Sequence, residues 1–397
     1  MQHNTASKIL PSPMIWEELD KQLAQLAEQG LLRHRRTLES PCGVEALLDG
    51  RKLLSFGSND YLGLAADPAL IEAAREAASQ WGVGTGSSHL VCGHMTPHEI
   101  LEQKLAAFVG SARALYFSTG MMANLGIVPA LVGRGDAIFS DRLNHASLID
   151  AALLSRAEHV RYQHSDLTTL ERQLTESSAK RKLILTDAVF SMDGDLAHLP
   201  QLLQMAERFD AWLVVDDAHG FGVLGEDGRG ALSHFGIAMN PRLIYMGTLG
   251  KAAGVSGAFV AGAANVIEWL MQRTRTYIFT TASSPIIAGA LLASLKLIEQ
   301  GNARRAHLQK LIARLKTGLA NTRWNLLPSS TAIQPIIIGE NDETLRVAAA
   351  LLEHGIWVPA IRPPTVPQGT ARLRVSLSAA HSLEQVDRLV IALRGLK

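Results

Sequence analysis

Short apolar runs alternate with longer amphipathic stretches along most of the chain, a pattern that is typical of an α/β fold. From residue 68 onward, the apolar runs have the length of strands, and helical stretches separate them. Strands separated in this way are expected to run parallel and to be buried on both faces of one sheet. The expected strands are 114–117, 137–139, 183–186, 212–215, 243–246, 257–261 and 277–281.

The segments on either side of this region follow other patterns. An amphipathic helix is expected over 14–29, and Asp49-Gly50 predicts a hairpin over 47–54. A capping box at Thr96 to Glu99 predicts a helix from there to about Val109. After a long helical region (285–319), the C-terminal elements are a strand (333–338), a helix (343–354), two strands (356–361 and 373–377) and a helix (383–393).

The chain has 397 residues, which is too long for one compact core. We therefore divide it into an N-terminal helix and hairpin segment (1–58), a large domain (59–290) and a small α+β domain (291–397).

Polar residues follow the expected strands of the large domain. In open parallel sheets, ligands bind beyond the carboxyl ends of the strands. A single His or Asp at such a place is more often a cap or a loop residue, but here they recur at successive strand ends. These residues are Thr119, His145, Ser191, Asp216, His219, Thr248 and Lys251.

Lys251 lies in a glycine-rich turn directly after the apolar run 243–246. Desolvation lowers the pKa of an ammonium group and makes the amine available as a nucleophile. On this stretch alone, a solvated lysine in a flexible loop is the alternative. A second glycine turn, 118–124, joins a strand to a helix N-terminus, where free backbone amides can hold a phosphate.

A lysine amine, a phosphate cradle and an aspartate at a strand end are the set that pyridoxal phosphate (PLP) requires. Lys251 would form a Schiff base with the cofactor, and Asp216 would pair with the pyridine nitrogen. His219 could bond the ring oxygen, and His145 could stack on the ring. The phosphate would be held by Gly120, Met121 and Thr248.

With these residues in place, the chain resembles the α-oxoamine synthases, which are PLP-dependent enzymes of fold type I. The matching segments extend from about residue 33 to the C-terminus and are 56–64 (FGSNDYLGL), 82–102, 141–152, 189–199, 212–230, the Lys251 loop and 361–381. Two stretches depart from the family pattern: Gly86-Ser87-Ser88-His89 lacks a further glycine, and Leu249-Gly250 replaces an aromatic–glycine pair.

The resemblance implies a large domain with a mostly parallel seven-stranded sheet between helices, a small α+β C-terminal domain, and a homodimer with shared active sites. It implies that Lys251, His145, Asp216 and His219 are catalytic. Further cofactor contacts would come from Ser191, and from Thr280 or Thr281 across the dimer interface. The substrate-binding residues implied are Asn59, His145 and Arg362, with Arg374 as a weaker candidate, and Arg33 and Thr365 at the acyl site.

Within this family, the stretch 361–367 (IRPPTVP) is most similar to the biotin-pathway branch. That branch joins L-alanine to a pimeloyl thioester and forms 8-amino-7-oxononanoate, carbon dioxide and the free thiol carrier. The sequence does not decide whether the thiol carrier is coenzyme A or an acyl carrier protein. A glycine C-acetyltransferase, or another family member with a different amino acid and acyl-CoA, is the alternative with the same cofactor chemistry.

Composition limits the other possibilities. The net charge is +1, from 38 basic and 37 acidic residues, which gives no support for nucleic-acid binding. Two cysteines, no signal-peptide pattern and no apolar run of membrane-spanning length favour a cytoplasmic protein away from membranes. No metal site is expected. A dinucleotide-binding oxidoreductase would need a glycine fingerprint after an early strand, and Gly82 to Gly86 has no convincing strand before it. The retained lysine, aspartate and histidines argue against a catalytically inactive binding protein.

Overall fold

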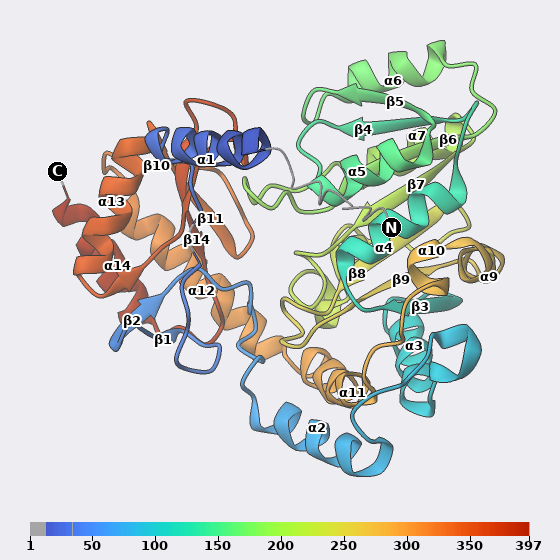
Figure 1. Ribbon diagram of the computed structural model, residues 1–397, viewed down its shortest axis with the longest axis horizontal. Coiled ribbons are helices and arrows are strands. Elements are labelled where there is room, and N and C mark those ends of the chain that lie inside the picture. The colour runs from blue at the N-terminus through green and yellow to red at the C-terminus, as the bar shows by residue number, and fades with distance from the viewer. Residues whose placement is uncertain (1–12, 34, 397) are drawn as a thin grey trace, which may run out of the picture.

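The computed structural model describes residues 13–33 and 35–396, and these form a large and a small unit (Figure 1). The large unit is built on a seven-stranded sheet with the order β3-β9-β8-β7-β6-β4-β5. Only β9 runs antiparallel to its neighbours, and the other pairings are parallel. The strands are β3 (Arg113–Phe117), β4 (Ala137–Asp141), β5 (Glu158–Tyr162), β6 (Lys182–Asp187), β7 (Ala211–Asp216), β8 (Leu243–Thr248) and β9 (Ala258–Gly262).

Helices cover both faces of this sheet, so its central strands are buried (Figure 1). Every residue of β4, β8 and β9 is buried, as expected for strands that have helices on both sides. The helices of the large unit are α2 (Pro68–Trp81), α3 (Thr96–Phe108), α4 (Gly120–Leu131), α5 (Ala146–Ser155), α6 (Leu167–Glu176), α7 (Leu199–Arg208), α8 (Ala231–His234), α9 (Ala264–Arg273), α10 (Arg275–Ile278) and α11 (Pro285–Glu299). Two short helical turns also occur, η1 (His89–Gly93) and η2 (Glu226–Gly228).

The small unit is formed by segments from both ends of the described chain. Its main sheet has the order β10 (Asn325–Leu326), β11 (Ile333–Gly339), β14 (Ala371–Ser376), β13 (Ala360–Ile361). Its helices are α12 (Asn302–Leu319), α13 (Asn341–Glu353) and α14 (Leu383–Gly395), and α12 packs against α14. The expected N-terminal elements are α1 (Pro13–Glu28) and the hairpin of β1 (Glu45–Leu48) and β2 (Arg51–Ser55). Because β12 (Ile356–Trp357) pairs with β2, the hairpin belongs to the C-terminal unit.

Several expectations about single elements are wrong. Residues 277–281 form no strand, because the amides of Tyr277 and Ile278 both donate to the Thr274 carbonyl, which makes a helical turn. The helical region 285–319 is two helices that meet near Gly301, and a Cβ at that residue would lie only 2.9 Å from the Leu297 carbonyl oxygen. Strand β5 was missed.

Two further boundaries differ from the sequence prediction. The strand expected over 356–361 is split at Pro359, which lacks an amide hydrogen, so β12 and β13 join different sheets. Helix α3 has its N-cap at Met95, whose amide donates to His98 Nδ1, so the cap lies one residue before the expected one. None of the helices in the described part of the chain is long and apolar enough to cross a membrane.

Candidate active site

A cavity of about 180 Å³ lies beyond the carboxyl ends of five strands of the large sheet. The loops after β3, β4, β6, β7 and β8 all contribute to it, because these strands point the same way. The lining residues are Gly120, Met121, Asn124, His145, Ser147, Asp187, Asp216, Ala218, His219, Met246, Thr248 and Lys251. Most of the residues predicted from strand ends therefore meet in one place.

Lys251 begins a chain of hydrogen bonds that crosses to the small unit. Lys251 Nζ lies 2.8 Å from His219 Nε2, and His219 Nδ1 lies 2.7 Å from the Tyr61 hydroxyl. That hydroxyl donates to Asn59 Oδ1 (3.1 Å), which also accepts from Arg374 Nη1 (3.0 Å). Since the Tyr61 proton is used on Asn59, the Tyr61 oxygen accepts from His219 Nδ1–H. His219 Nε2 is then free to accept from the lysine.

The charge states of this pair fit that arrangement. Burial lowers the pKa of Lys251 to about 8, and the nearby Asp216 and Asp187 oppose only part of this shift. Burial also lowers the pKa of His219 well below its ordinary value, and the neighbouring cations Lys251 and Arg374 lower it further. His219 is therefore a neutral imidazole, and the amine is close to losing its proton near neutral pH.

Asp216 ends β7, and its carboxylate is buried and held in one orientation. Oδ2 accepts from Asn124 Nδ2 (2.7 Å), and Oδ1 accepts from the Ala218 amide (2.9 Å). Asp187 ends the adjacent strand β6 in register with it. Burial and the Asp216 charge raise the pKa of Asp187 well above its ordinary value. The two strand ends thus present one carboxylate and one carboxyl group that favours its neutral form.

His145 is the N-cap of α5, and its ring orientation is set by that role. Its Nδ1 accepts from the Ser147 amide (3.2 Å), so in the neutral ring the proton lies on Nε2. Its own amide donates to Asp187 Oδ2 (2.6 Å). Burial lowers the pKa of His145, Asp216 opposes this, and the Lys251 charge adds to it, so the ring favours its neutral form.

The start of α4 lines the same cavity as the lysine. Thr119 caps α4 by accepting from the Met122 amide (3.1 Å), and the first amides of a helix have no intrahelical partner. Thr248, at the end of β8, places its hydroxyl beside the start of this helix, 3.8 Å from the position of a Cβ on Gly120. The first amides of α4 are therefore available to a phosphate, whereas the Thr248 hydroxyl donates to the Gly257 carbonyl (3.1 Å) and would have to exchange it for a phosphate oxygen.

With this geometry in place, the chain can be compared with known proteins. The family model for class I and II aminotransferases matches residues 51–393. The 8-amino-7-oxononanoate synthase of Herminiimonas arsenicoxydans is 73% identical over 96% of this chain and 100% of its own length. The protein of that name from Aromatoleum aromaticum is 64% identical over 97% of this chain and 99% of its own. This chain belongs to the class I and II aminotransferases, in the family of the 8-amino-7-oxononanoate synthases.

Solved structures agree with this membership. The 8-amino-7-oxononanoate synthase from Francisella tularensis has a TM-score of 0.75 at 34% identity and covers 86% of this chain and 97% of that one. A serine palmitoyltransferase from Sphingomonas wittichii has a TM-score of 0.88 at 32% identity, with 98% of both chains covered. The enzyme from S. paucimobilis, solved with bound PLP, has a TM-score of 0.90 at 29% identity over 97% of this chain and 98% of its own. The expected fold class and family are confirmed.

A second cavity, of about 840 Å³, contains two of the three arginines that the family resemblance assigns to substrates. Arg33 and Arg362 both line it, together with Arg36. Its walls are mostly apolar and include Trp357, Val358 and Pro359. The Pro359 carbonyl accepts from the Arg374 amide (3.0 Å), so this cavity borders the strand that carries Arg374.

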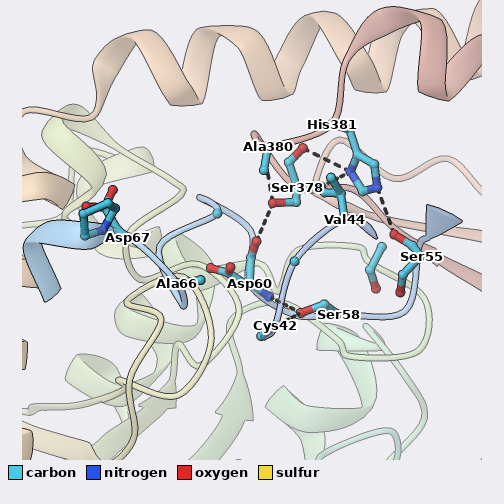
Figure 2. Close-up of a pocket in the computed structure, with 14 residues that line it drawn as sticks. Cys42, Val44, Ser55, Ser58, Asp60, Ala66, Asp67, Ser378, Ala380 and His381 are labelled. Atoms are coloured by element: carbon cyan, nitrogen blue, oxygen red, sulfur yellow. Dashed lines mark hydrogen bonds between the residues drawn. The ribbon is translucent and has the colours of Figure 1, made fainter. Parts of the chain in front are cut away.

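A third cavity, of about 330 Å³, lies where the N-terminal hairpin and the small unit meet the large one (Figure 2). Its polar groups are paired with each other. His381 accepts from the Ser378 amide and donates to the Ser55 carbonyl, and Ser378 Oγ donates to the Asp60 carbonyl (Figure 2). The bond from Ser378 to the Asp60 carbonyl ties the small unit to the large one, and the bonds of His381 lie within the small unit. Because its polar groups are used in this way, we assign this cavity a structural role.

The remaining family-assigned residues lie outside the first cavity. The Ser191 carbonyl accepts from Arg374 Nε (2.6 Å), which places Ser191 next to the hydrogen-bond chain. Thr280 is half-buried, Thr281 is exposed, and neither lines the cavity of its own chain. Thr365 is exposed and does not line the arginine cavity. These assignments remain predictions.

Several residues of the site were missed from the sequence, among them Tyr61, Asn124 and Asp187. Asp187 could have been found, because it directly follows the strand 183–186. Tyr61 lies in the loop 56–64, which the sequence analysis matched to the family without assigning a role to Tyr61. Asn124 lies inside α4, and nothing in the local pattern separates it from a core position.

Proposed function

We propose that this protein is a PLP-dependent acyltransferase that condenses L-alanine with a pimeloyl thioester to give 8-amino-7-oxononanoate, carbon dioxide and the free thiol carrier. One observation carries the proposal. The half-buried Lys251 amine bonds a neutral His219 in the same cavity as the buried Asp216 carboxylate. This arrangement occurs in a chain that is 73% identical to a protein named 8-amino-7-oxononanoate synthase.

The residues of the cavity fit PLP. Lys251 offers an amine for the aldehyde, and Asp216 offers a buried carboxylate for the pyridine nitrogen. The start of α4 offers amide donors for the phosphate, and the Thr248 hydroxyl would turn to it from the Gly257 carbonyl. When bound, PLP supplies an electron sink for negative charge that develops at the substrate α-carbon.

The protein's own groups would then orient the substrate and move its protons. Lys251 Nζ is the group that would take and return the α-proton, since its pKa of about 8 lies near the working pH. His219 keeps the amine in place through its unprotonated Nε2. The His145 ring, fixed by the Ser147 amide, would lie against the cofactor face with its Nε2 proton available to an acyl oxygen.

The alanine carboxylate would be bound at the end of the hydrogen-bond chain. Arg374 is buried and donates to Asn59, and Tyr61 alone separates Asn59 from the His219 ring. Arg362, which we had preferred over Arg374, lies instead in the arginine cavity with Arg33. The geometry therefore favours Asn59 with Arg374 for the amino-acid carboxylate.

The arginine cavity suits the acyl chain. A pimeloyl group has an apolar middle and a distal carboxylate, and this cavity has apolar walls with Arg33 and Arg362 on its lining. A hydrogen bond to a charged group contributes about 1.5–3 kcal/mol. Chain length in an apolar pocket is discriminated by only about 10–200-fold per methylene. Recognition of the distal carboxylate should therefore decide the preference for pimeloyl over acetyl substrates.

We also propose a homodimer with shared active sites, in the cytoplasm. Thr280 and Thr281 do not line the cavity of their own chain and follow Phe279, which is 70% exposed, and this supports the proposal that they contact a partner's site. Both cysteines are free, as a reducing compartment favours. The thiol carrier would be coenzyme A or an acyl carrier protein, and comparing the two pimeloyl thioesters at equal concentration would distinguish them.

Steady-state kinetics with two substrate pairs tests the function. We expect kcat/KM for pimeloyl thioester with L-alanine to exceed that for acetyl-CoA with glycine, with 8-amino-7-oxononanoate identified by mass spectrometry. Lys251→Ala should lose covalently attached cofactor and nearly all turnover, while the exposed Lys310→Ala should retain both. A higher kcat/KM for acetyl-CoA with glycine would make the protein a glycine C-acetyltransferase. Borohydride reduction that fixes the cofactor to another lysine would refute the site itself.

A further inference from the structure

Three histidines that take no part in the proposed reaction converge at the start of α3. His89 and His94 lie at either end of η1, and His98 lies in the first turn of α3. One ring nitrogen from each histidine lies within 4.8 Å of the others. None of the three lines the cavity that contains Lys251.

The three rings are spaced as imidazoles around one ion are spaced. Their centroids are 5.1 Å (His89–His94), 5.2 Å (His89–His98) and 5.7 Å (His94–His98) apart. Tetrahedral zinc with Zn–N bonds of about 2.0–2.1 Å holds the nitrogens about 3.3 Å and the ring centres about 5 Å apart. The Nδ1 atoms of His89 and His94 are 2.9 Å apart. Small ring rotations that move these atoms a few tenths of an ångström further apart would give the spacing that zinc requires.

Partners outside the cluster already orient two of the rings. His94 Nε2 donates to Glu99 Oε2 (3.1 Å), and His98 Nε2 donates to the Ser283 carbonyl (2.8 Å). Metal-binding histidines commonly donate their second N–H to a carboxylate or a backbone carbonyl in this way. In both residues Nδ1 is therefore the nitrogen that carries no proton. His94 Nδ1 accepts from His89, and His98 Nδ1 accepts from the Met95 amide (3.0 Å).

The hydrogen bond between His89 Nδ1 and His94 Nδ1 is one that a cation could replace, because metal ligation uses ring nitrogens that carry no proton. An ion between His89 and His94 would take the place of the proton in their hydrogen bond. That proton would move from His89 Nδ1 to His89 Nε2, so binding would release no net proton.

We propose that His89, His94 and His98 form a binding site for a divalent transition metal ion of the zinc class. Three imidazoles suit Zn²⁺, and Co²⁺ takes the same geometry. The side chain of His94 is 25% exposed, which leaves a path for the ion and room for a water molecule as the fourth ligand. His98 would exchange the Met95 amide for the ion and keep its bond to Ser283.

The test is metal binding by the untagged, PLP-loaded protein after dialysis against a chelator. Titration calorimetry with Zn²⁺ should give one equivalent per chain, and Co²⁺ should give the visible absorption of a tetrahedral nitrogen site. His94→Gln should weaken Zn²⁺ binding by about 100-fold or more. Glu99→Ala removes only the group that accepts from His94 Nε2 and should weaken it by about 10–100-fold.

His354→Gln is the matched control, because this exposed histidine lies at the end of α13 and the variant keeps the cofactor and every other residue. It should bind Zn²⁺ as the wild type does. The readout does not depend on turnover, so a failure of the proposed reaction would leave this test intact. Equal Zn²⁺ affinity in wild type and His94→Gln, or a wild type that binds no Zn²⁺ at tens of micromolar, would overturn the proposal.

Discussion

The pKa of Lys251 gives a quantitative prediction about the reactivity of the cofactor-free protein. Burial lowers this pKa from an ordinary value near 10.5 to about 8. The difference of about 2.5 units corresponds to about 300-fold more free amine near pH 7 than an exposed lysine has. The unprotonated amine is the nucleophile, so Lys251 should be labelled at a pH where other lysines scarcely react.

Competitive acetylation measures this directly. The cofactor-free protein is treated with a trace of a neutral anhydride between pH 6 and pH 10.5, and the peptides are quantified by mass spectrometry. The exposed Lys310 serves as the internal reference. We expect the labelling of Lys251 to reach half of its plateau near pH 8. A midpoint above pH 10 would show that burial does not hold this amine neutral, and the charge states derived for the site would be wrong.

Two substitutions should move that midpoint in opposite directions. Asp216 raises the pKa of Lys251 and Arg374 lowers it. Asp216→Asn should therefore move the midpoint below pH 8, and Arg374→Gln should move it above. The same linkage makes the free energy of unfolding rise with pH between about 8 and 10.5, because the unfolded lysine still holds its proton there. Shifts of the same sign in both variants would contradict the electrostatic argument.

Three further predictions concern single residues. Tyr61→Phe leaves His219 Nδ1–H without its acceptor, which costs about 1–3 kcal/mol and should lower kcat about tenfold or more in steady-state assays. Asp217→Asn should lower the unfolding temperature in a thermal melt more than it lowers turnover, because Asp217 Oδ2 accepts from the Ala231 amide and the Tyr245 hydroxyl. Asp216→Asn should lower turnover more than it lowers the unfolding temperature. Arg33→Ala should raise KM for the pimeloyl thioester about 10–150-fold with little effect on KM for alanine, and equal effects on both would remove Arg33 from the acyl site.

Sequence pattern was sufficient for the residues that follow directly from strand topology. His145, Asp216 and Lys251 lie within a few residues of apolar runs, and parallel strands bring such positions to one edge. Their meeting in one cavity depends on the shared direction of the strands and not on any particular side-chain contact. This is why the cavity could be predicted without knowing which strands are neighbours.

The missed residues depend on contacts between distant segments. Tyr61 reaches His219 across 158 positions of sequence, and Asn124 reaches Asp216 across 92. The spacing of hydrophobic and polar residues within one element does not predict such a bond, because the bond forms only when whole elements pack together. The wrong strand at 277–281 has a related cause, since Tyr277 and Ile278 belong to the short helix α10, which packs against α4 and η1.

The hydrogen-bond chain from Arg374 to Lys251 links the geometry of the small unit to the reactive amine. Arg374 lies on β14 in the small unit, whereas His219 follows β7 in the large sheet. Tyr61 can orient His219 only while its own proton is held by Asn59, and Asn59 also accepts from Arg374. A displacement of β14 would remove this second donor from Asn59 and loosen each later bond of the chain. The position of the C-terminal unit should therefore influence which nitrogen of His219 carries the proton, and through it the availability of the lysine.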